Sequence, residues 1–115
     1  MPRISFGSTV RQKRVERQIG LREFAKQIGV SPTYLSKVER DEFAPPAEDK
    51  VVRIAQLLEL DRDALLALAG KVASDVQDII RRHPVETASF LRSTKGWTAE
   101  RLAAFVKDAA RKHKA

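Results

Sequence analysis

The amino-acid sequence of 115 residues predicts an all-α protein, with five helices over residues 1–70 and about three more over residues 71–115. Apolar side chains recur every three or four residues along most of the chain, which is the spacing of one face of an α-helix. Glycine and proline residues separate these periodic stretches, at places where one helix would end or the next begin. We therefore treat residues 1–70 as one domain and residues 71–115 as a helical extension.

The central motif of the chain is the sequence LREFAKQIGVSPTYLSKVER, residues 21–40. Gly29 follows the first helix, at an end where glycine accepts a left-handed conformation without a Cβ clash. Ser31 can cap a second helix through its hydroxyl, and Pro32 suits the first helical position because its missing N–H is not needed there. The first helix has one apolar face, formed by Leu21, Phe24, Ala25 and Ile28.

The second helix of this motif has an inward edge and an outward face. Leu35 and Val38 lie on the inward edge at helical spacing. Two short helices joined by a tight turn form a helix-turn-helix, whose second helix can enter the major groove of DNA. The side chains left on the other sides of this helix are Thr33, Tyr34, Ser36, Lys37 and Arg40.

Three segments resemble the Cro/CI-type helix-turn-helix regulators of the XRE family: LREFAK, IGVSPTYLSKVER and IAQLLELDRDALLALAG. The resemblance covers about residues 6–70. It implies the five-helix, lambda repressor-like fold and binding to double-stranded DNA. Positions in the family motif imply DNA base contacts for Pro32, Thr33, Ser36 and Lys37. Phosphate contacts are expected for Arg11, Arg22, Ser31, Tyr34 and Arg40.

The resemblance also implies a structural ion pair between Arg14 and Glu39, which would hold the first helix against the recognition helix. The alternative is that these are two independent, solvated charges.

The first helix is expected over about Ser5–Gln18, and Arg3 ahead of it could touch the DNA backbone. The apolar face of this helix is expected to consist of Phe6, Val10 and Val15.

The segment between the recognition helix and Gly70 is interpreted as scaffold. Phe43 is expected to plug the core rather than to act as a functional aromatic residue. The prolines that follow it break the helix and stiffen the loop. A fourth helix is expected from about Ala47 to Leu58, and Asp61 is expected to cap a fifth.

The extension is expected to form three helices, separated by Pro84 and Gly96. We expect Trp97 and the apolar stripe that includes Phe105 to build or reinforce a dimer interface. The alternative is that the extension packs on the fourth and fifth helices of its own chain. The apolar residues that mark the three helices are Val72, Val76, Ile79 and Ile80, then Val85, Ala88 and Leu91, then Leu102, Phe105, Val106 and Ala109.

The net charge of +7 arises from 22 lysines and arginines against 15 aspartates and glutamates. Residues 1–46 hold nine basic and five acidic residues (+4), residues 47–70 hold three and five (−2), and residues 71–115 hold ten and five (+5). A basic helical protein favours a polyanionic partner, although this charge could also simply keep a small protein in solution.

Other features narrow the class of protein. The absence of cysteine excludes disulfides and cysteine-bound metal, and it fits a reducing cytosol. The N-terminus has no long apolar run, so we expect no signal peptide, no membrane span and a cytoplasmic location. The two histidines, His83 and His113, lie outside any metal-ligand spacing. We therefore expect a protein that is not an enzyme, with no cofactor and no metal site.

Together these observations predict a sequence-specific transcriptional regulator, in particular a repressor that uses the recognition helix at residues 31–40. One recognition helix contacts too few base pairs to be selective, so we expect a homodimer on a palindromic operator with half-sites about 10 bp apart. The alternative is an antitoxin or a partner-controlled switch, whose extension binds a toxin or a protease.

Overall fold

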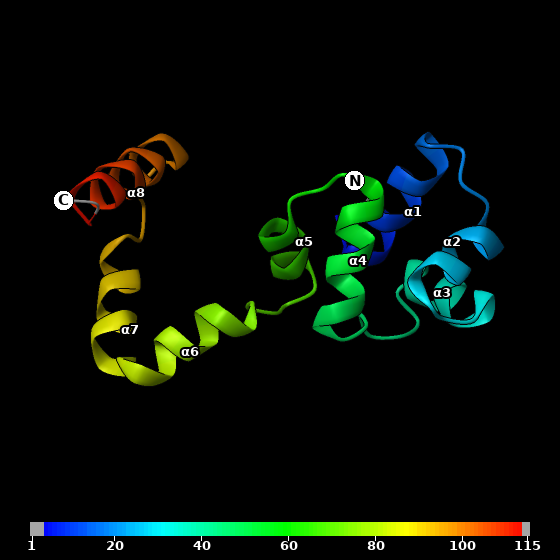
Figure 1. Cartoon of the computed structure of the whole chain (residues 1–115), viewed down its shortest axis with the longest axis horizontal. Coiled ribbons are helices and arrows are strands. Elements are labelled where there is room, and N and C mark those ends of the chain that lie inside the picture. The colour runs from blue at the N-terminus through cyan, green and yellow to red at the C-terminus, as the bar shows by residue number, and fades with distance from the viewer. Residues whose placement is uncertain (1–3, 114–115) are drawn as a thin grey trace. The chain divides into compact units, whose positions relative to one another are not determined.

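The computed structural model describes residues 4–113, which form eight α-helices and no β-strand (Figure 1). This confirms the all-α prediction, whereas Arg3 and its predicted DNA contact lie outside the described residues. The helices are α1 (Phe6–Glu16), α2 (Leu21–Ile28), α3 (Pro32–Glu39), α4 (Glu48–Leu58), α5 (Arg62–Leu68), α6 (Ser74–Arg82), α7 (Pro84–Ser93) and α8 (Ala99–His113).

The chain divides into two compact units, the first ending at Ser74 and the second beginning at Asp75. The sequence placed a division at Gly70, four residues earlier. The difference arises because Ala73 is only 4% exposed and belongs to the core of the first unit. Ser74 is also held there, since its backbone N–H and its hydroxyl donate to the carboxylate of Glu48 at 2.9 and 3.1 Å.

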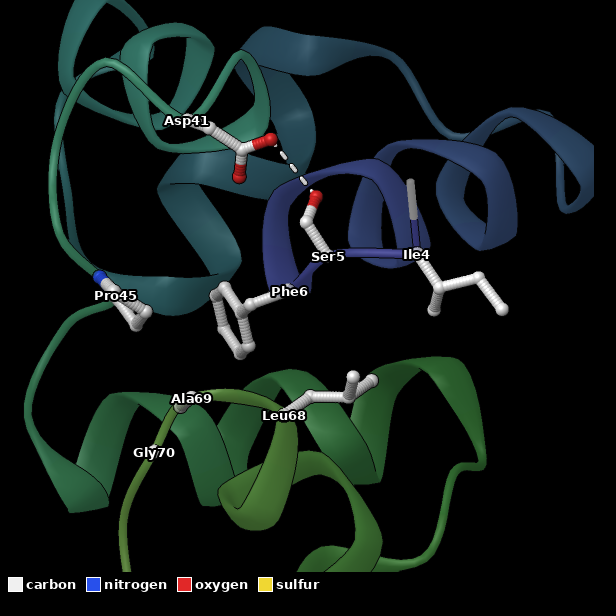
Figure 2. A pocket seen from close by; sticks show the side chains of 8 residues that line it. All are labelled: Ile4, Ser5, Phe6, Asp41, Pro45, Leu68, Ala69 and Gly70. Carbon is white, nitrogen blue, oxygen red and sulfur yellow. Dashed lines mark hydrogen bonds between the residues drawn. The ribbon is translucent and has the colours of Figure 1, made fainter. Parts of the chain in front are cut away.

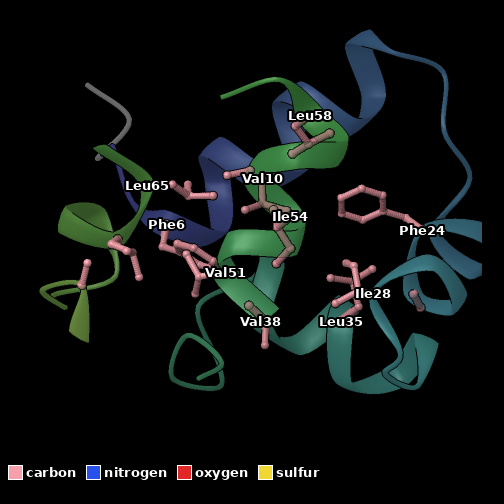
Figure 3. Close-up of a cluster of buried hydrophobic side chains, with 14 residues drawn as sticks. Phe6, Val10, Phe24, Ile28, Leu35, Val38, Val51, Ile54, Leu58 and Leu65 are labelled. Carbon is pink, nitrogen blue, oxygen red and sulfur yellow. The ribbon is translucent and has the colours of Figure 1, made fainter. Parts of the chain in front are cut away.

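The first unit has a single apolar core between its five helices, and α4 runs through the middle of it (Figure 3). α4 packs against α1, α2 and α5, while α3 packs against α1 and α2. Burying one large apolar side chain stabilises a fold by about 1.5–3 kcal/mol, so this core is the main source of stability. Its largest fully buried side chains are Phe24, Leu35, Ile54, Leu58, Leu65, Leu66, Val10 and Val51.

α1 starts at a capping box. The Oγ of Ser5 accepts a hydrogen bond from the Ser8 N–H at 3.0 Å, and the Oγ of Ser8 accepts one from the Ser5 N–H at 3.0 Å. Phe6 and Val10 are buried as predicted, but the prediction for Val15 was wrong, because its side chain is 56% exposed. Val15 follows Phe6 by two and a half helical turns, so it lies about 180° around the helix from it.

Gly7 lets α1 come very close to the end of α3. A Cβ at this position would lie 2.3 Å from the carbonyl oxygen of Val38 and 2.8 Å from that of Glu39. Both neighbours are backbone atoms, which cannot move aside as a flexible side chain could. Only glycine therefore fits here, a requirement that the sequence analysis did not identify.

The turn between α2 and α3 has the predicted chemistry. Gly29 has a φ of 88° and donates its N–H to the carbonyl oxygen of Ala25 at 2.9 Å. The Oγ of Ser31 accepts a hydrogen bond from the Tyr34 N–H at 3.1 Å, and Pro32 begins α3. The predicted helix-turn-helix is therefore confirmed.

Positive φ angles follow the other helices of the first unit as well. Gly70, just beyond α5, has a left-handed conformation with a φ of 70°. Gln18, Asp41 and Glu59 also adopt it, with φ angles of 57°, 62° and 54°. These three are not glycine, and an L-residue in this conformation carries a cost of about 1–2 kcal/mol. The end of α4 at Leu58 was predicted from the sequence, but the left-handed conformation of these three residues was not.

α4 and α5 begin near the predicted positions. Ala47 precedes α4 without a side-chain cap, and two acidic residues in the first turn, Glu48 and Asp49, suit the positive end of the helix dipole. Asp61 caps α5, since its Oδ1 accepts a hydrogen bond from the Ala64 N–H at 2.9 Å.

The second unit contrasts with the first, because none of its described residues is buried. Phe90 on α7 and Trp97 both face Phe105 on α8, with ring centroids 5.5 and 5.7 Å away. The guanidinium of Arg101 lies 4.0 Å above the Trp97 ring. Large apolar side chains that remain exposed in this unit are Val76, Ile79, Val85, Phe90, Leu91, Leu102, Phe105 and Val106.

No helix in residues 4–113 is both long enough and apolar enough to cross a membrane.

Candidate nucleic-acid interface

α3 is fixed along its inner edge and open along its outer side. Leu35 and Val38 are each 2% exposed and belong to the core. Thr33 is exposed, and Lys37, half-buried, follows it by one helical turn. Pro32 and Ser36 are also half-buried. The helix can therefore present polar side chains to a ligand without any change in the core.

Two adjoining hollows lie beside α3. The larger, of about 320 Å³, is lined by Leu21, Arg22, Pro32, Thr33, Ser36 and Arg40. The smaller, of about 210 Å³, is lined by Arg11, Arg14, Leu21, Ser36, Glu39 and Arg40. We call these two hollows together the arginine recess. It brings side chains from α1, the start of α2 and α3 to one place, including three of the four predicted base-contact residues.

A bidentate ion pair holds α1 against the last turn of α3. The Nε and Nη2 of Arg14 donate to the two carboxylate oxygens of Glu39 at 2.8 and 3.0 Å. The Nη1 of Arg14 donates to the carbonyl oxygen of Ile19 at 2.8 Å. All three nitrogens are thus engaged, so Arg14 anchors the helices and is not placed to hold a phosphate.

The other arginines of the recess differ in how free they are. Arg11 and Arg22 are exposed, and in the described part of the chain neither side chain makes a hydrogen bond or an ion pair. Arg40 is also exposed, but its Nε lies 2.8 Å from the carboxylate of Glu42. An exposed pair of this kind contributes about 0–1 kcal/mol, so an incoming phosphate can compete for Arg40 at low cost.

The start of α2 adds backbone donors to the same place. Gly20 precedes α2 and provides no side-chain hydrogen bond to the first turn. Leu21, which follows it, is half-buried against the core. The first N–H groups of a helix carry a partial positive charge and bind anions. The N-terminus of α2, beside Arg22, therefore suits a phosphate.

The remaining predicted contact residues lie outside the arginine recess. Ser31 is exposed, and its hydroxyl caps α3 while keeping its own O–H as a donor. The ring of Tyr34 packs 5.9 Å from that of Phe43, and the Nζ of Lys37 lies 5.0 Å from the centroid of the Phe43 ring. A second group of contacting side chains, which we call the Phe43 cluster, consists of Tyr34, Lys37 and Phe43.

The prediction that Phe43 plugs the core was wrong, since this side chain is 45% exposed. The cause lies in the backbone after α3, where Asp41 turns left-handed and its carboxylate accepts a hydrogen bond from the hydroxyl of Ser5 at 2.8 Å (Figure 2). Pro45 lines the hollow seen there together with Phe6, whereas Phe43 does not line it. The sequence shows Phe43 six residues after Lys37. This spacing predicts that the two side chains are neighbours only once the backbone turn after α3 is known.

The chemistry of this surface is that of binding. Exposed guanidiniums, hydroxyls, a lysine and the uncapped start of a helix are all hydrogen-bond donors, which suits an anionic partner. Among residues 4–113, no group of three or more histidine, cysteine, aspartate or glutamate side chains could hold a metal ion.

The fold and this surface together define a helix-turn-helix protein of the DNA-binding type. Residues 7–71 match the family model described as a helix-turn-helix domain, which is more than half of the chain. The chain therefore belongs to this family of XRE-type, Cro/CI-like regulators, whose members are DNA-binding transcription regulators and not enzymes.

Two relatives show the extent of this similarity. An uncharacterized HTH-type transcriptional regulator of Mycobacterium tuberculosis is 35% identical over 78 residues, 64% of this chain and 55% of that protein. The ImmF control region 10 kDa protein of Bacillus phage phi105 is 37% identical over 59 residues, 51% of this chain and 64% of that protein. The chain thus spans between about half and two thirds of these relatives.

Two solved structures resemble this one. One is the P22 c2 repressor in complex with a synthetic operator. The match covers 55% of this chain and 94% of the repressor chain, at 25% identity and a TM-score of 0.50. The SinR protein/SinI protein complex contains a chain that covers 96% of this one and 99% of its own, at 21% identity and a TM-score of 0.51. The second likeness concerns the fold alone.

Proposed function

We propose that this protein is a sequence-specific repressor that places α3 in the major groove of double-stranded DNA. The observation that carries this proposal is the arginine recess. It places the unpaired guanidiniums of Arg11 and Arg22 beside the outer side of α3, a helix that a buried ion pair holds in place. Phosphate contacts from these two arginines would fix the register of α3 on the duplex.

Base recognition is assigned to the outer side of α3. Lys37 can donate to O6 or N7 of guanine, and Thr33 can bond a base edge or pack its methyl on thymine. Ser36 can donate or accept a hydrogen bond, whereas Pro32 offers apolar contact only. Direct contacts of this kind are few, so DNA shape is expected to contribute to selectivity.

The remaining predicted residues are assigned to positioning. Ser31, Tyr34 and Arg40 are polar at the two ends of α3 and can donate to phosphate oxygens. Such contacts orient the protein on the duplex without specifying a base. Arg40 would exchange its contact with Glu42 for one with DNA.

We further propose that the protein acts as a homodimer on a palindromic operator. A single recognition helix covers one half-site, and two-fold symmetry in the protein matches two-fold symmetry in the DNA. The second unit supports this, because its apolar side chains have no buried position within their own unit. Phe105 and Trp97 are the proposed centre of the interface. Occupying an operator that overlaps a promoter would block transcription.

A second candidate function also rests on the second unit. Its exposed apolar side chains could instead receive a different protein, such as a toxin or a protease, which would make the chain an antitoxin or a partner-controlled switch. The two candidates are compatible, because DNA binding belongs to the first unit and partner binding to the second.

Fluorescence anisotropy tests the DNA-binding proposal. The full chain is titrated into the duplex from upstream of its own gene and into a scrambled duplex, each at two salt concentrations. Lys37→Ala is compared with Lys107→Ala, which removes the same charge from an exposed position on α8. We expect selective binding that Lys37→Ala weakens by about 1–3 kcal/mol and Lys107→Ala leaves unchanged. Weak, equal binding to both duplexes that salt abolishes would contradict the proposal.

A further inference from the structure

We propose that Phe43 is a positioning residue for Lys37, holding its ammonium group ready for a base contact. This inference rests on the proposed function, because it assumes that Lys37 contacts a base. The Nζ of Lys37 lies 5.0 Å from the centroid of the Phe43 ring, within the range of a cation–π interaction. Phe43 is 45% exposed, so it is poorly explained as a core residue.

The backbone after α3 brings Phe43 to Lys37. Asp41, with a φ of 62°, donates its N–H to the carbonyl oxygen of Val38 at 3.1 Å. The N–H groups of Glu42 and Phe43 both donate to the carbonyl oxygen of Lys37, at 2.9 and 3.3 Å. These bonds form a Schellman-type helix end, in which the chain folds back over the last turn. The two side chains are therefore neighbours because of the backbone and not through a chance rotamer.

Tyr34 also packs against the Phe43 ring. Its centroid lies 5.9 Å from that of Phe43 with an interplanar angle of 44°, a usual separation for an aromatic pair. Tyr34 precedes Lys37 by one helical turn, so the two side chains are neighbours on the surface of α3. The ring of Phe43 is thus held by Tyr34 and by the backbone turn while Lys37 lies against it.

The ammonium group remains available to DNA. Glu42, the acidic residue next to Phe43, pairs with Arg40 at 2.8 Å. In the described part of the chain, Lys37 makes no ion pair. An aromatic ring occupies only one side of an ammonium group, which has three N–H donors, so donors remain for O6 and N7 of guanine.

The physical advantage of this arrangement is a lower ordering cost. A free lysine side chain has many rotamers, and immobilising such a side chain at an interface is unfavourable. A ring that already restricts the side chain in the unbound protein removes part of that cost. Phe43 therefore favours the contact made by Lys37 and adds nothing to binding that lacks this contact.

A double-mutant cycle in the full chain tests this inference. Phe43→Leu keeps an apolar side chain but removes the π face, and Phe43→Tyr restores an aromatic ring. Each is measured by anisotropy on the duplex that the wild type binds selectively and on a scrambled duplex, alone and combined with Lys37→Ala. We expect Phe43→Leu to weaken selective binding about two- to fivefold, the strength of an exposed cation–π contact. Phe43→Tyr should restore it, and the scrambled duplex should show no change.

The Lys37→Ala background decides between positioning and direct contact. If Phe43 acts through Lys37, Phe43→Leu has no further effect once Lys37 is alanine. A loss that persists in that background would overturn the inference, because Phe43 would then contact DNA itself. Unchanged selective binding by Phe43→Leu would also overturn it.

Failure of the proposed function looks different. If Lys37→Ala alone leaves selective binding unchanged, the base contact itself is wrong, and the inference falls with it. If Lys37→Ala weakens binding but Phe43→Leu does not, only the inference falls.

NMR gives a readout without DNA. Ring-current shifts of the Lys37 side-chain protons should vanish in Phe43→Leu and remain in Phe43→Tyr.

Discussion

The guanidinium of Arg14 and the carboxylate of Glu39 meet through two parallel hydrogen bonds, with Nε–Oε2 at 2.8 Å and Nη2–Oε1 at 3.0 Å. Their side chains are only 12% and 3% exposed. Arg14 also donates to the carbonyl oxygen of Ile19, so one side chain joins α1, the turn after it and the end of α3. A pair this buried matters most when it is broken, since the remaining charge has neither partner nor water.

Glu39→Ala is therefore expected to lower the free energy of unfolding by about 3–5 kcal/mol. The alanine leaves the Arg14 guanidinium in a mostly buried place with one acceptor instead of three. Urea denaturation, monitored by circular dichroism, measures this change in the free energy of unfolding. The double variant Arg14→Met/Glu39→Leu removes both charges and should be less destabilised than Glu39→Ala. A free energy of unfolding for Glu39→Ala equal to that of the wild type would show that Arg14 and Glu39 are two independent charges.

Gly7→Ala should also destabilise the first unit, for a steric reason. The added Cβ would lie 2.3 Å from the Val38 carbonyl oxygen, so α1 and α3 would have to separate. Overpacking typically costs about 1–3 kcal/mol, and here backbone atoms on one side leave little room to relax.

Gly20→Ser serves as the control for this variant. A Cβ at Gly20 meets nothing within 4 Å, and serine would supply the N-cap that α2 lacks. Its stability should stay within a few tenths of a kcal/mol of the wild type or rise. Equal melting temperatures for Gly7→Ala and the wild type would contradict the close approach of the two helices.

Local signals in the sequence predicted the helix-turn-helix well. Gly29, Ser31 and Pro32 act within one turn of their own position, so their roles can be deduced without knowing the fold. The pair between Arg14 and Glu39 is different, because no local pattern links residues 25 positions apart. That pair was predicted only through the resemblance to a family.

Two of the features that sequence reasoning missed, at Gly7 and Phe43, depend on how the chain folds around them. The need for glycine at position 7 arises from a helix that passes nearby much later in the chain. The exposure of Phe43 follows from a left-handed Asp41, an uncommon conformation for a residue other than glycine. Val15 was assigned to the core because it is apolar, although its angle around α1 places it on the solvent side.

Arg11→Ala and Arg22→Ala are expected to weaken DNA binding by the same factor on every sequence. Both arginines are proposed phosphate contacts, and a phosphate carries no sequence information. Each substitution should reduce the slope of log K against log salt concentration by about 1, because one counterion fewer is released. Arg92→Ala on α7 is the matched control and should leave the slope unchanged. A loss confined to the selective duplex would instead assign these arginines to base recognition.

Truncation after Ser74 should convert a dimer into a monomer. The buried residues of the described chain end at Ala73, so the shortened chain keeps its core and should melt near the wild-type temperature. Light scattering of both chains at equal concentration measures the mass. Phe105→Glu, at the proposed centre of the interface, should give the same result as truncation.

A truncated chain that remains dimeric would place the interface in the first unit. The exposed apolar residues Leu68 and Val72, which are 40% and 45% exposed at the end of α5 and just beyond it, would then be the next candidates for the interface.

The truncated chain also separates binding to one half-site from the preference for two half-sites. Its first unit retains α3 and the arginine recess, so a monomer should still bind one half-site. It should lose the preference for two half-sites about one helical turn apart, because that spacing is set by the dimer.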